Sequence, residues 1–84
     1  MTEVEVRAAL AAALRSIAPD ADISLVDVEA DYRLQLQLDS FDFLRLMQAF
    51  HAATGVDVTE DAYPSAVSIR GLSDYIRKIT SARS

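Results

Sequence analysis

The residue of this chain best suited to covalent chemistry is Ser40, a serine that directly follows Asp39. We expect the second long helix of the chain to begin at this pair. The start of a helix attracts anions, because its free N–H groups and its dipole favour negative charge. A phosphoryl group on the Ser40 hydroxyl would lie in that field, whereas a serine in this position is more commonly a simple helix cap. The residues alone leave both interpretations open.

Enzyme chemistry is the weakest interpretation. The only histidine, His51, follows Ser40 by eleven residues on the same expected helix, about 16 Å along the axis, which is too far for a nucleophile and its base. We take His51 as a surface residue, and Asp39 and Asp42 as caps rather than an acid–base pair. One histidine and no cysteine exclude a structural zinc site and disulfides. We expect no catalytic residues and no metal.

Composition narrows the class of partner. The chain has 84 residues, 13 acidic and eight basic, with a formal charge of −5. We expect one domain over residues 1–84, monomeric, with no nucleic acid partner, because phosphate binding needs a basic patch. No apolar run approaches the roughly 20 residues that cross a bilayer, so we expect no membrane insertion. The acidic residues 1–5 are unlike a signal peptide, which favours the cytoplasm.

Hydrophobic periodicity predicts how Ser40 is positioned. We expect helices over residues 3–17, 39–54 and from Ser68 onward, with a short helical turn at 60–63. Residues 34–38 alternate between leucine and glutamine, which is a strand pattern, but a single strand without a partner is not stable. We therefore expect residues 19–38 to form a long loop whose apolar side chains cover the core. The predicted fold is all-α, a four-helix bundle with a long first loop and a short third helix.

Caps and core residues follow from the same pattern. Thr2 and Glu5 predict a capping box, Gly55 a helix C-terminus, and Thr59 and Ser68 further caps. One stripe of the second long helix faces the core and is expected to pack on the first and last helices. The expected core residues are Phe43, Leu46, Met47, Phe50, Leu10, Leu14, Leu72 and Ile76.

Two apolar residues beside Ser40 do not belong to this stripe. Phe41 and Leu44 share another side of the helix with Gln48 and His51. An apolar side chain on an outer face often marks a surface that something else covers. The cover is either a partner protein or the long first loop, and the sequence leaves both possibilities open.

The segment Leu38-Asp39-Ser40-Phe41-Asp42-Phe43-Leu44 resembles the Asp-Ser-Leu-Asp attachment motif of acyl carrier proteins. The order of the expected helices also agrees with that family, and residues 54–58 look like the turn after its second helix. The resemblance covers nearly the whole chain. Asp-Ser alone is a weak motif, but it is far more specific at the head of the second of four helices in a small acidic chain.

The resemblance implies a function and a set of site residues. A phosphopantetheinyl transferase, using coenzyme A and magnesium, would attach 4′-phosphopantetheine to Ser40, and Asp39 would help to present that serine. The arm would carry acyl groups as thioesters in fatty-acid, polyketide or related biosynthesis, without catalysis by the carrier. Acyl-loading and acyl-transfer enzymes would dock on the second helix. The residues implied in docking are Phe41, Asp42, Leu44, Arg45 and Gln48.

The chain departs from the family pattern in two places. The glycine that often precedes the serine is replaced, with Gln37 in its position and Leu38 directly before Asp39. The second helix of typical fatty-acid carriers is strongly acidic, whereas positions 43–54 hold no acid and include Arg45. We therefore expect a specialised carrier with a more apolar, less negative docking face.

Two alternatives to an acyl carrier stay open. A peptidyl carrier protein would share the fold and the attachment chemistry but carry an aminoacyl or peptidyl group. The Asp-Ser-Phe-Asp motif and the net acidity favour the acyl type. A small helical adaptor without a cofactor would instead use Phe41 and Leu44 to hold a partner.

Overall fold

The computed structural model describes residues 1–83, and their side chains as far as Ser81. The elements of this part are α1 (Glu3–Leu14), η1 (Ile23–Leu25), α2 (Tyr32–Gln35), α3 (Ser40–Thr54), η2 (Glu60–Ala62) and α4 (Ile69–Arg83). The four α-helices, with no strand in the described residues, confirm the all-α architecture. The short α2 lies within the long first loop, and the expected short third helix is the single 3₁₀ turn η2.

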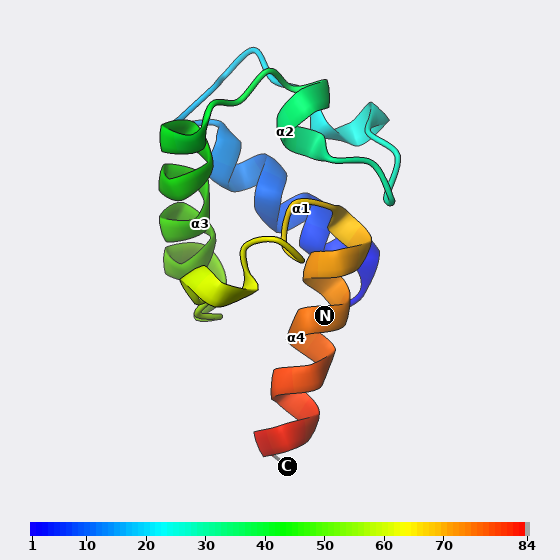
Figure 1. Cartoon of the computed structure of the whole chain (residues 1–84). Helices are drawn as coiled ribbons and strands as arrows, with labels where there is room; N and C mark the ends of the chain where they lie inside the picture. The colour runs from blue at the N-terminus through cyan, green and yellow to red at the C-terminus, as the bar shows by residue number, and fades with distance from the viewer. Residues whose placement is uncertain (84) are drawn as a thin grey trace.

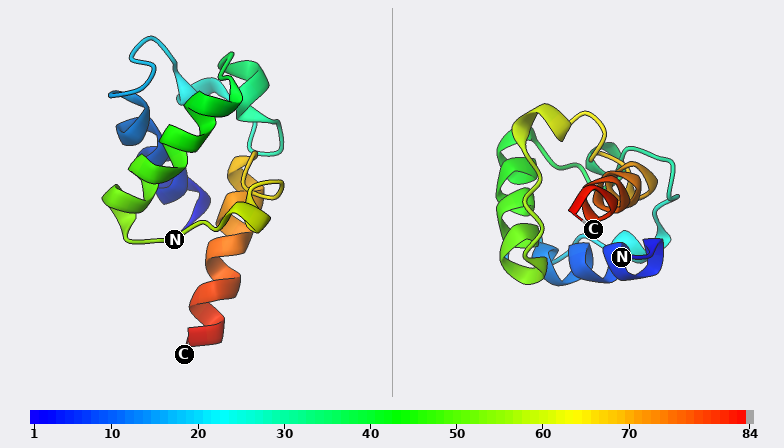
Figure 2. Two further views of the ribbon diagram at one scale, coloured as in Figure 1. Left: turned by 60° about the vertical axis from the view of Figure 1, so that its left-hand side comes forward. Right: turned by 90° about the horizontal axis from the view of Figure 1, so that it is seen from below.

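Of the three long helices, α1 is the central one, because it packs against both α3 and α4. Seen from below, α1 and α3 form the two sides of an angle, and α4 lies between them (Figure 2). The C-terminal end of α4 projects beyond the other elements (Figure 1), and the longest dimension of the molecule is 38 Å. None of the described helices is long and apolar enough to cross a membrane.

Helix α1 starts where the sequence predicts and ends earlier. The Thr2 hydroxyl accepts the Glu5 N–H, and a Glu5 carboxylate oxygen accepts the Thr2 N–H, so the capping box is confirmed. The predicted end at residue 17 is wrong by three residues. The N–H groups of Ile17 and Ala18 both donate to the Leu14 carbonyl, which tightens the chain into a turn ahead of Pro19.

The long first loop covers the core only in part. Ile23, Val26 and Tyr32 are buried, as expected of a loop that packs apolar side chains inward. The same expectation is wrong for Leu25 and Leu34, which are 87% and 78% exposed. Both lie in the helical turns η1 and α2, and such turns direct successive side chains to different sides.

Side chains from the rest of the fold hold the loop in place. Arg7 Nη1 donates to the carbonyls of Ile23 and Val26, at 2.6 and 2.7 Å. The Tyr32 hydroxyl donates to the Ala66 carbonyl, and its burial raises the pKa of the phenol. These bonds satisfy polar groups that the loop would otherwise bury without partners, and they hold the loop at two places, near residues 23–26 and at Tyr32.

All eight predicted core residues are buried, which confirms the stripe on α3. The remaining buried apolar side chains come from α1, η1, α2 and α4, and from the loops between the elements. They are Val6, Ala13, Ile23, Val26, Tyr32, Val58, Ala66 and Ile69.

The start of α4 packs very closely on the turn before it. Ser68 Oγ accepts the Gly71 N–H at 3.0 Å, which confirms Ser68 as a cap. A Cβ atom on Gly71 would lie 2.0 Å from the Ser65 carbonyl oxygen, so this approach requires glycine. The predicted Thr59 cap is wrong in its chemistry: Thr59 precedes η2, but its side chain makes no capping hydrogen bond.

Candidate functional site

Asp39, rather than Ser40, caps helix α3. Asp39 Oδ1 accepts the Asp42 N–H at 2.7 Å, and Asp42 Oδ2 accepts the Asp39 N–H at 3.4 Å. These two bonds form the capping box expected for this helix, and Gly55 ends the helix in the left-handed conformation. The carboxylates of Asp39 and Asp42 thus hold the backbone of the first turn, which agrees with caps rather than an acid–base pair.

The Ser40 hydroxyl takes no part in capping the helix. Ser40 is exposed at the first position of α3, and among the described residues none is hydrogen-bonded to its hydroxyl. The nearby first-turn N–H groups of the helix lack intrahelical acceptors. An exposed, unengaged hydroxyl beside such donors fits the attachment of a phosphoryl-linked group.

The backbone before Ser40 adopts an unusual conformation. Gln37 has φ 57°, the one positive φ among the described non-glycine residues. This is the position at which the resemblance led us to expect glycine, and left-handed φ is what glycine allows without steric cost. Gln37 therefore adopts a conformation that glycine would adopt at lower cost, and the loop carries local backbone strain at this residue.

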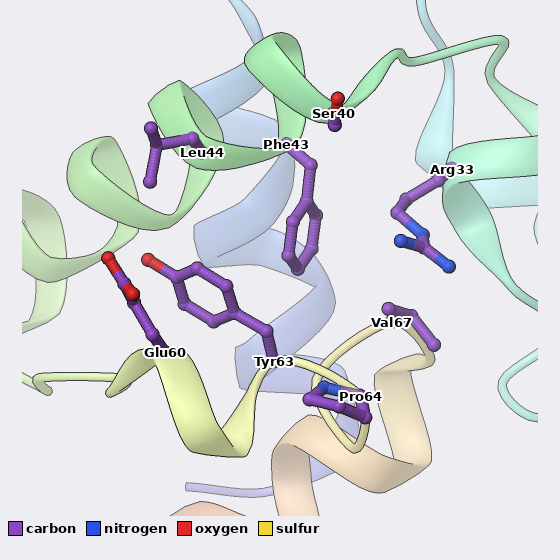
Figure 3. A pocket seen from close by; sticks show the side chains of 8 residues that line it. All are labelled: Arg33, Ser40, Phe43, Leu44, Glu60, Tyr63, Pro64 and Val67. Carbon is purple, nitrogen blue, oxygen red and sulfur yellow. The ribbon is translucent and has the colours of Figure 1, made fainter.

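A groove opens beside Ser40, between α3 and the segment that contains η2. Its volume is about 540 Å³, and most of its lining is apolar. Figure 3 shows Ser40 at its upper edge, Phe43 at its centre and Glu60 at the end away from Arg33. The lining residues are Arg33, Ser40, Phe43, Leu44, Glu60, Tyr63, Pro64 and Val67.

Aromatic contacts shape the groove. The Tyr63 ring meets Phe43 edge to face, with 5.3 Å between centroids and 83° between the ring planes. On the other side, the Arg33 guanidinium lies 5.4 Å from the Phe43 centroid, within the range of a cation–π contact. The buried Phe43 ring therefore contacts both Tyr63 on one side of the groove and Arg33 on the other.

Ionisable groups at the groove have shifted pKa values. A hydrogen bond from Arg33 lowers the pKa of Asp31, and the same bond raises the pKa of Arg33. Desolvation raises the pKa of the Tyr63 phenol, and the negative charges of Glu60 and Asp57 act in the same direction. At neutral pH the groove therefore presents a cation at Arg33 and a neutral phenol at Tyr63.

The residues expected to dock partners lie in different environments. Phe41 is 68% exposed, and Arg45 and Gln48 are exposed as well. Leu44 is half-buried, because it lines the groove. Asp42 is half-buried in the capping box.

The alternative in which the long first loop covers Phe41 and Leu44 is wrong. Phe41 stays exposed, and Leu44 shares its groove with Glu60 and Tyr63 of the η2 segment. His51 is also exposed. Its Nδ1 is 4.0 Å from Asp57 Oδ1. Because His51 lies at the opposite end of α3 from Ser40, His51 and Ser40 do not form a catalytic pair. No group of acids and histidines that could hold a metal occurs in the described part of the chain.

Sequence reasoning missed several residues of this site. The groove is also lined by Arg33, which lies on the preceding loop, and by four residues 20 or more positions after Ser40: Glu60, Tyr63, Pro64 and Val67. Periodicity assigns a face to a helical residue but does not say which loop packs beside it. The one available signal was the pair Tyr63-Pro64, in which an aromatic residue ends the predicted short helical turn and a proline stops it.

Comparison with known proteins supports the chemistry suggested by this geometry. A family model described as "phosphopantetheine attachment site" matches residues 5–76, which include Ser40, α3 and the groove. No solved structure matches the chain significantly.

Proposed function

Because this chain belongs to the phosphopantetheine attachment-site family, we propose that it is an acyl carrier protein whose arm is attached to Ser40. The cofactor of the family is covalently bound 4′-phosphopantetheine. A carrier domain of this kind interacts with a phosphopantetheinyl transferase and with enzymes that handle acyl groups. The proposal adds that the chain is a non-catalytic, cytoplasmic monomer made of one domain, working in fatty-acid, polyketide or related biosynthesis.

The observation that carries the assignment of Ser40 is the division of labour at the start of α3. Asp39 and Asp42 hold the helix end, while the Ser40 hydroxyl is exposed and unengaged. In the transfer step, the Ser40 oxygen would attack the phosphorus of coenzyme A nearest to pantetheine. Adenosine 3′,5′-bisphosphate would leave, and the serine proton would pass to a base of the transferase.

The residues of the chain then have mainly positional roles. When bound, the arm supplies a thiol that holds an acyl group as a thioester. The first-turn N–H groups and the dipole of α3 favour the negative phosphodiester on Ser40. The groove beside Ser40 offers apolar surface, through Phe43 and Tyr63, to whatever the arm brings near. Tethering raises the concentration of the cargo at each partner enzyme.

We assign partner docking to the exposed part of α3. Phe41 presents an apolar ring next to Ser40, and Arg45 and Gln48 continue the exposed surface. Asp42 and Leu44 complete the proposed docking set, although each also has a structural contact within the chain. This surface lacks the row of acids typical of fatty-acid carriers, which supports a specialised partner.

The test is enzymatic modification followed by peptide mass spectrometry. The protein is incubated with coenzyme A, magnesium and a broad-specificity transferase, and we expect one arm, on the peptide that contains Ser40. Ser40→Ala should remain unmodified, while Ser65→Ala, which removes another exposed serine, should be modified normally. An arm on Ser40→Ala would contradict the assignment. The mass of the load on protein isolated from its own cells would separate acyl from peptidyl carriers.

A further inference from the structure

Arg33 is held more rigidly than a surface arginine usually is. Its Nε lies 3.0 Å from Asp31 Oδ1, and its Nη2 lies 2.7 Å from Asp31 Oδ2. The Phe43 ring fixes the guanidinium from a second direction, at 5.4 Å. Asp31 is itself anchored, because its Oδ1 also accepts the Arg33 N–H as the cap of α2. The guanidinium is therefore preorganised, and little side-chain entropy would be lost when it binds something further.

Part of this guanidinium is free. A guanidinium has five N–H donors, and Asp31 engages those on Nε and Nη2. Nη1 has no hydrogen-bond acceptor among the described residues. The side chain keeps 37% of its surface exposed and lines the groove that begins at Ser40. Asp31 thus binds one edge of the fork, and the unused donors are available to a second acceptor.

The groove is polar at both ends and has opposite charges there. Arg33 and Ser40 lie at one end, and Glu60 lies at the other, with the Tyr63 hydroxyl directed toward it (Figure 3). The space between holds apolar side chains such as Phe43. An anion in this groove is attracted at the Arg33 end and repelled at the Glu60 end. The attractive end is the one at which a group on Ser40 would enter.

We propose that Arg33 binds an anionic group on the arm carried by Ser40, and this inference rests on the function proposed above. The anion is either the phosphodiester that joins the arm to Ser40 or a carboxylate of the cargo. Both are planar or forked acceptors that suit the free donors of a guanidinium. Arg33 is a positioning residue in the first case and a residue that selects the cargo in the second.

The experiment follows the Arg33 side chain and the phosphorus atom by NMR. Nitrogen-15 spectra of the arginine Nε–H groups are recorded for four forms: apo, holo, acetyl-loaded and malonyl-loaded. Phosphorus-31 spectra are recorded for the last three forms, because the apo protein contains no phosphorus. If the phosphodiester is the anion, the Arg33 signal shifts between apo and holo, and the phosphorus signal of holo Arg33→Gln differs from that of the wild type. If the cargo carboxylate is the anion, the Arg33 signal is the same in the apo, holo and acetyl-loaded forms and shifts only in the malonyl-loaded form.

Matched variants separate binding from structure. Arg77→Gln removes another ion-paired arginine, on α4, and should leave the phosphorus signal unchanged. Arg33→Lys keeps the charge but loses the fork, and should shift the phosphorus signal partway. In the malonyl form, the pKa of the cargo carboxylate should be lower in the wild type than in Arg33→Gln, because a nearby cation stabilises the charged form.

The outcomes are separable from those of the proposed function. An Arg33 signal that is the same in all four forms, with unchanged phosphorus signals in Arg33→Gln, overturns the role of Arg33. Such a result leaves the carrier function intact, since the mass of the holo form already shows whether Ser40 is modified. Failure of Ser40 to accept the arm at all would instead overturn the proposed function and this inference with it.

Discussion

The Oδ1 atom of Asp39 lies 2.7 Å from the backbone nitrogen of Asp42, so the residue before Ser40 caps α3. Replacing Asp39 by alanine removes that acceptor and should lower the free energy of unfolding by about 1 kcal/mol. Asp39→Asn should retain most of the stability, because asparagine also caps. Urea denaturation measures both, with Asp20→Ala in an exposed turn as the control. Equal loss in Asp39→Ala and Asp20→Ala would show that the cap contributes nothing.

Gln37 provides a test of backbone strain next to the site. Its φ of 57° is costly for residues with a side chain, by roughly 1–2 kcal/mol in the left-handed region. Glycine removes this cost but loses about 0.5–1 kcal/mol through the entropy of the unfolded chain. We expect Gln37→Gly to be more stable by up to about 1.5 kcal/mol, and Gln37→Val to be less stable than the wild type. A lower melting temperature for Gln37→Gly would contradict the strain.

Gly71→Ala and Gly55→Ala should both lower the stability of the fold, but for different physical reasons. A Cβ on Gly71 would meet the Ser65 carbonyl oxygen at 2.0 Å, so Gly71→Ala must displace the start of α4. Overpacking of this kind costs roughly 1–3 kcal/mol or more. Gly55 has φ 76° and open space around it, so Gly55→Ala should cost only the strain, about 1 kcal/mol. Calorimetry should show the larger loss of melting temperature for Gly71→Ala.

Two phenylalanines on α3 should behave oppositely. Phe50 is fully buried, and truncation of a buried phenylalanine to alanine costs roughly 3–5 kcal/mol. This is a large share of the stability of so small a domain, so Phe50→Ala should be largely unfolded. Phe41 is 68% exposed, so Phe41→Ala should have the melting temperature of the wild type. The partner enzyme should nevertheless load this variant more slowly. A cooperative melt of Phe50→Ala near that of the wild type would show that Phe50 is not part of the core.

Sequence patterns predicted α3 best, because every relevant signal there is local. Asp39, Asp42 and Gly55 act on backbone groups within four residues, and the core stripe follows from the helical period. The N-terminal cap of α1 was equally local. Residues that make contacts between segments distant in sequence carry only weak local signals of this kind.

The long first loop and the groove depend on contacts between distant segments. Leu34 has the same apolar character as the half-buried Leu36, and only the direction of the α2 turn exposes it. Arg33 reaches the groove because Asp31 and Phe43 hold it there, and Phe43 lies on another helix. No periodicity in a single sequence specifies such a pairing, so the groove could not be predicted.

The last prediction concerns the charge of the proposed docking surface. Arg45 is exposed on α3 and forms no ion pair among the described residues, and positions 43–54 contain no acid. A partner that fits this surface would contact Phe41 and would not present a basic patch to Arg45. Binding that depends mainly on apolar contact should vary little with salt, since screening acts on exposed charges.

Arg45→Glu should therefore slow acyl loading by the cognate enzyme and improve recognition by fatty-acid enzymes that have basic docking patches. The melting temperature should stay the same, because an exposed charge without a partner contributes little to stability. Arg15→Glu makes the same charge change at an exposed position just after α1 and should affect neither enzyme. Equal effects of Arg15→Glu and Arg45→Glu would mean that net charge, rather than the α3 surface, determines recognition. Unchanged loading of Arg45→Glu, with Phe41→Ala also unaffected, would place the docking surface elsewhere on the molecule.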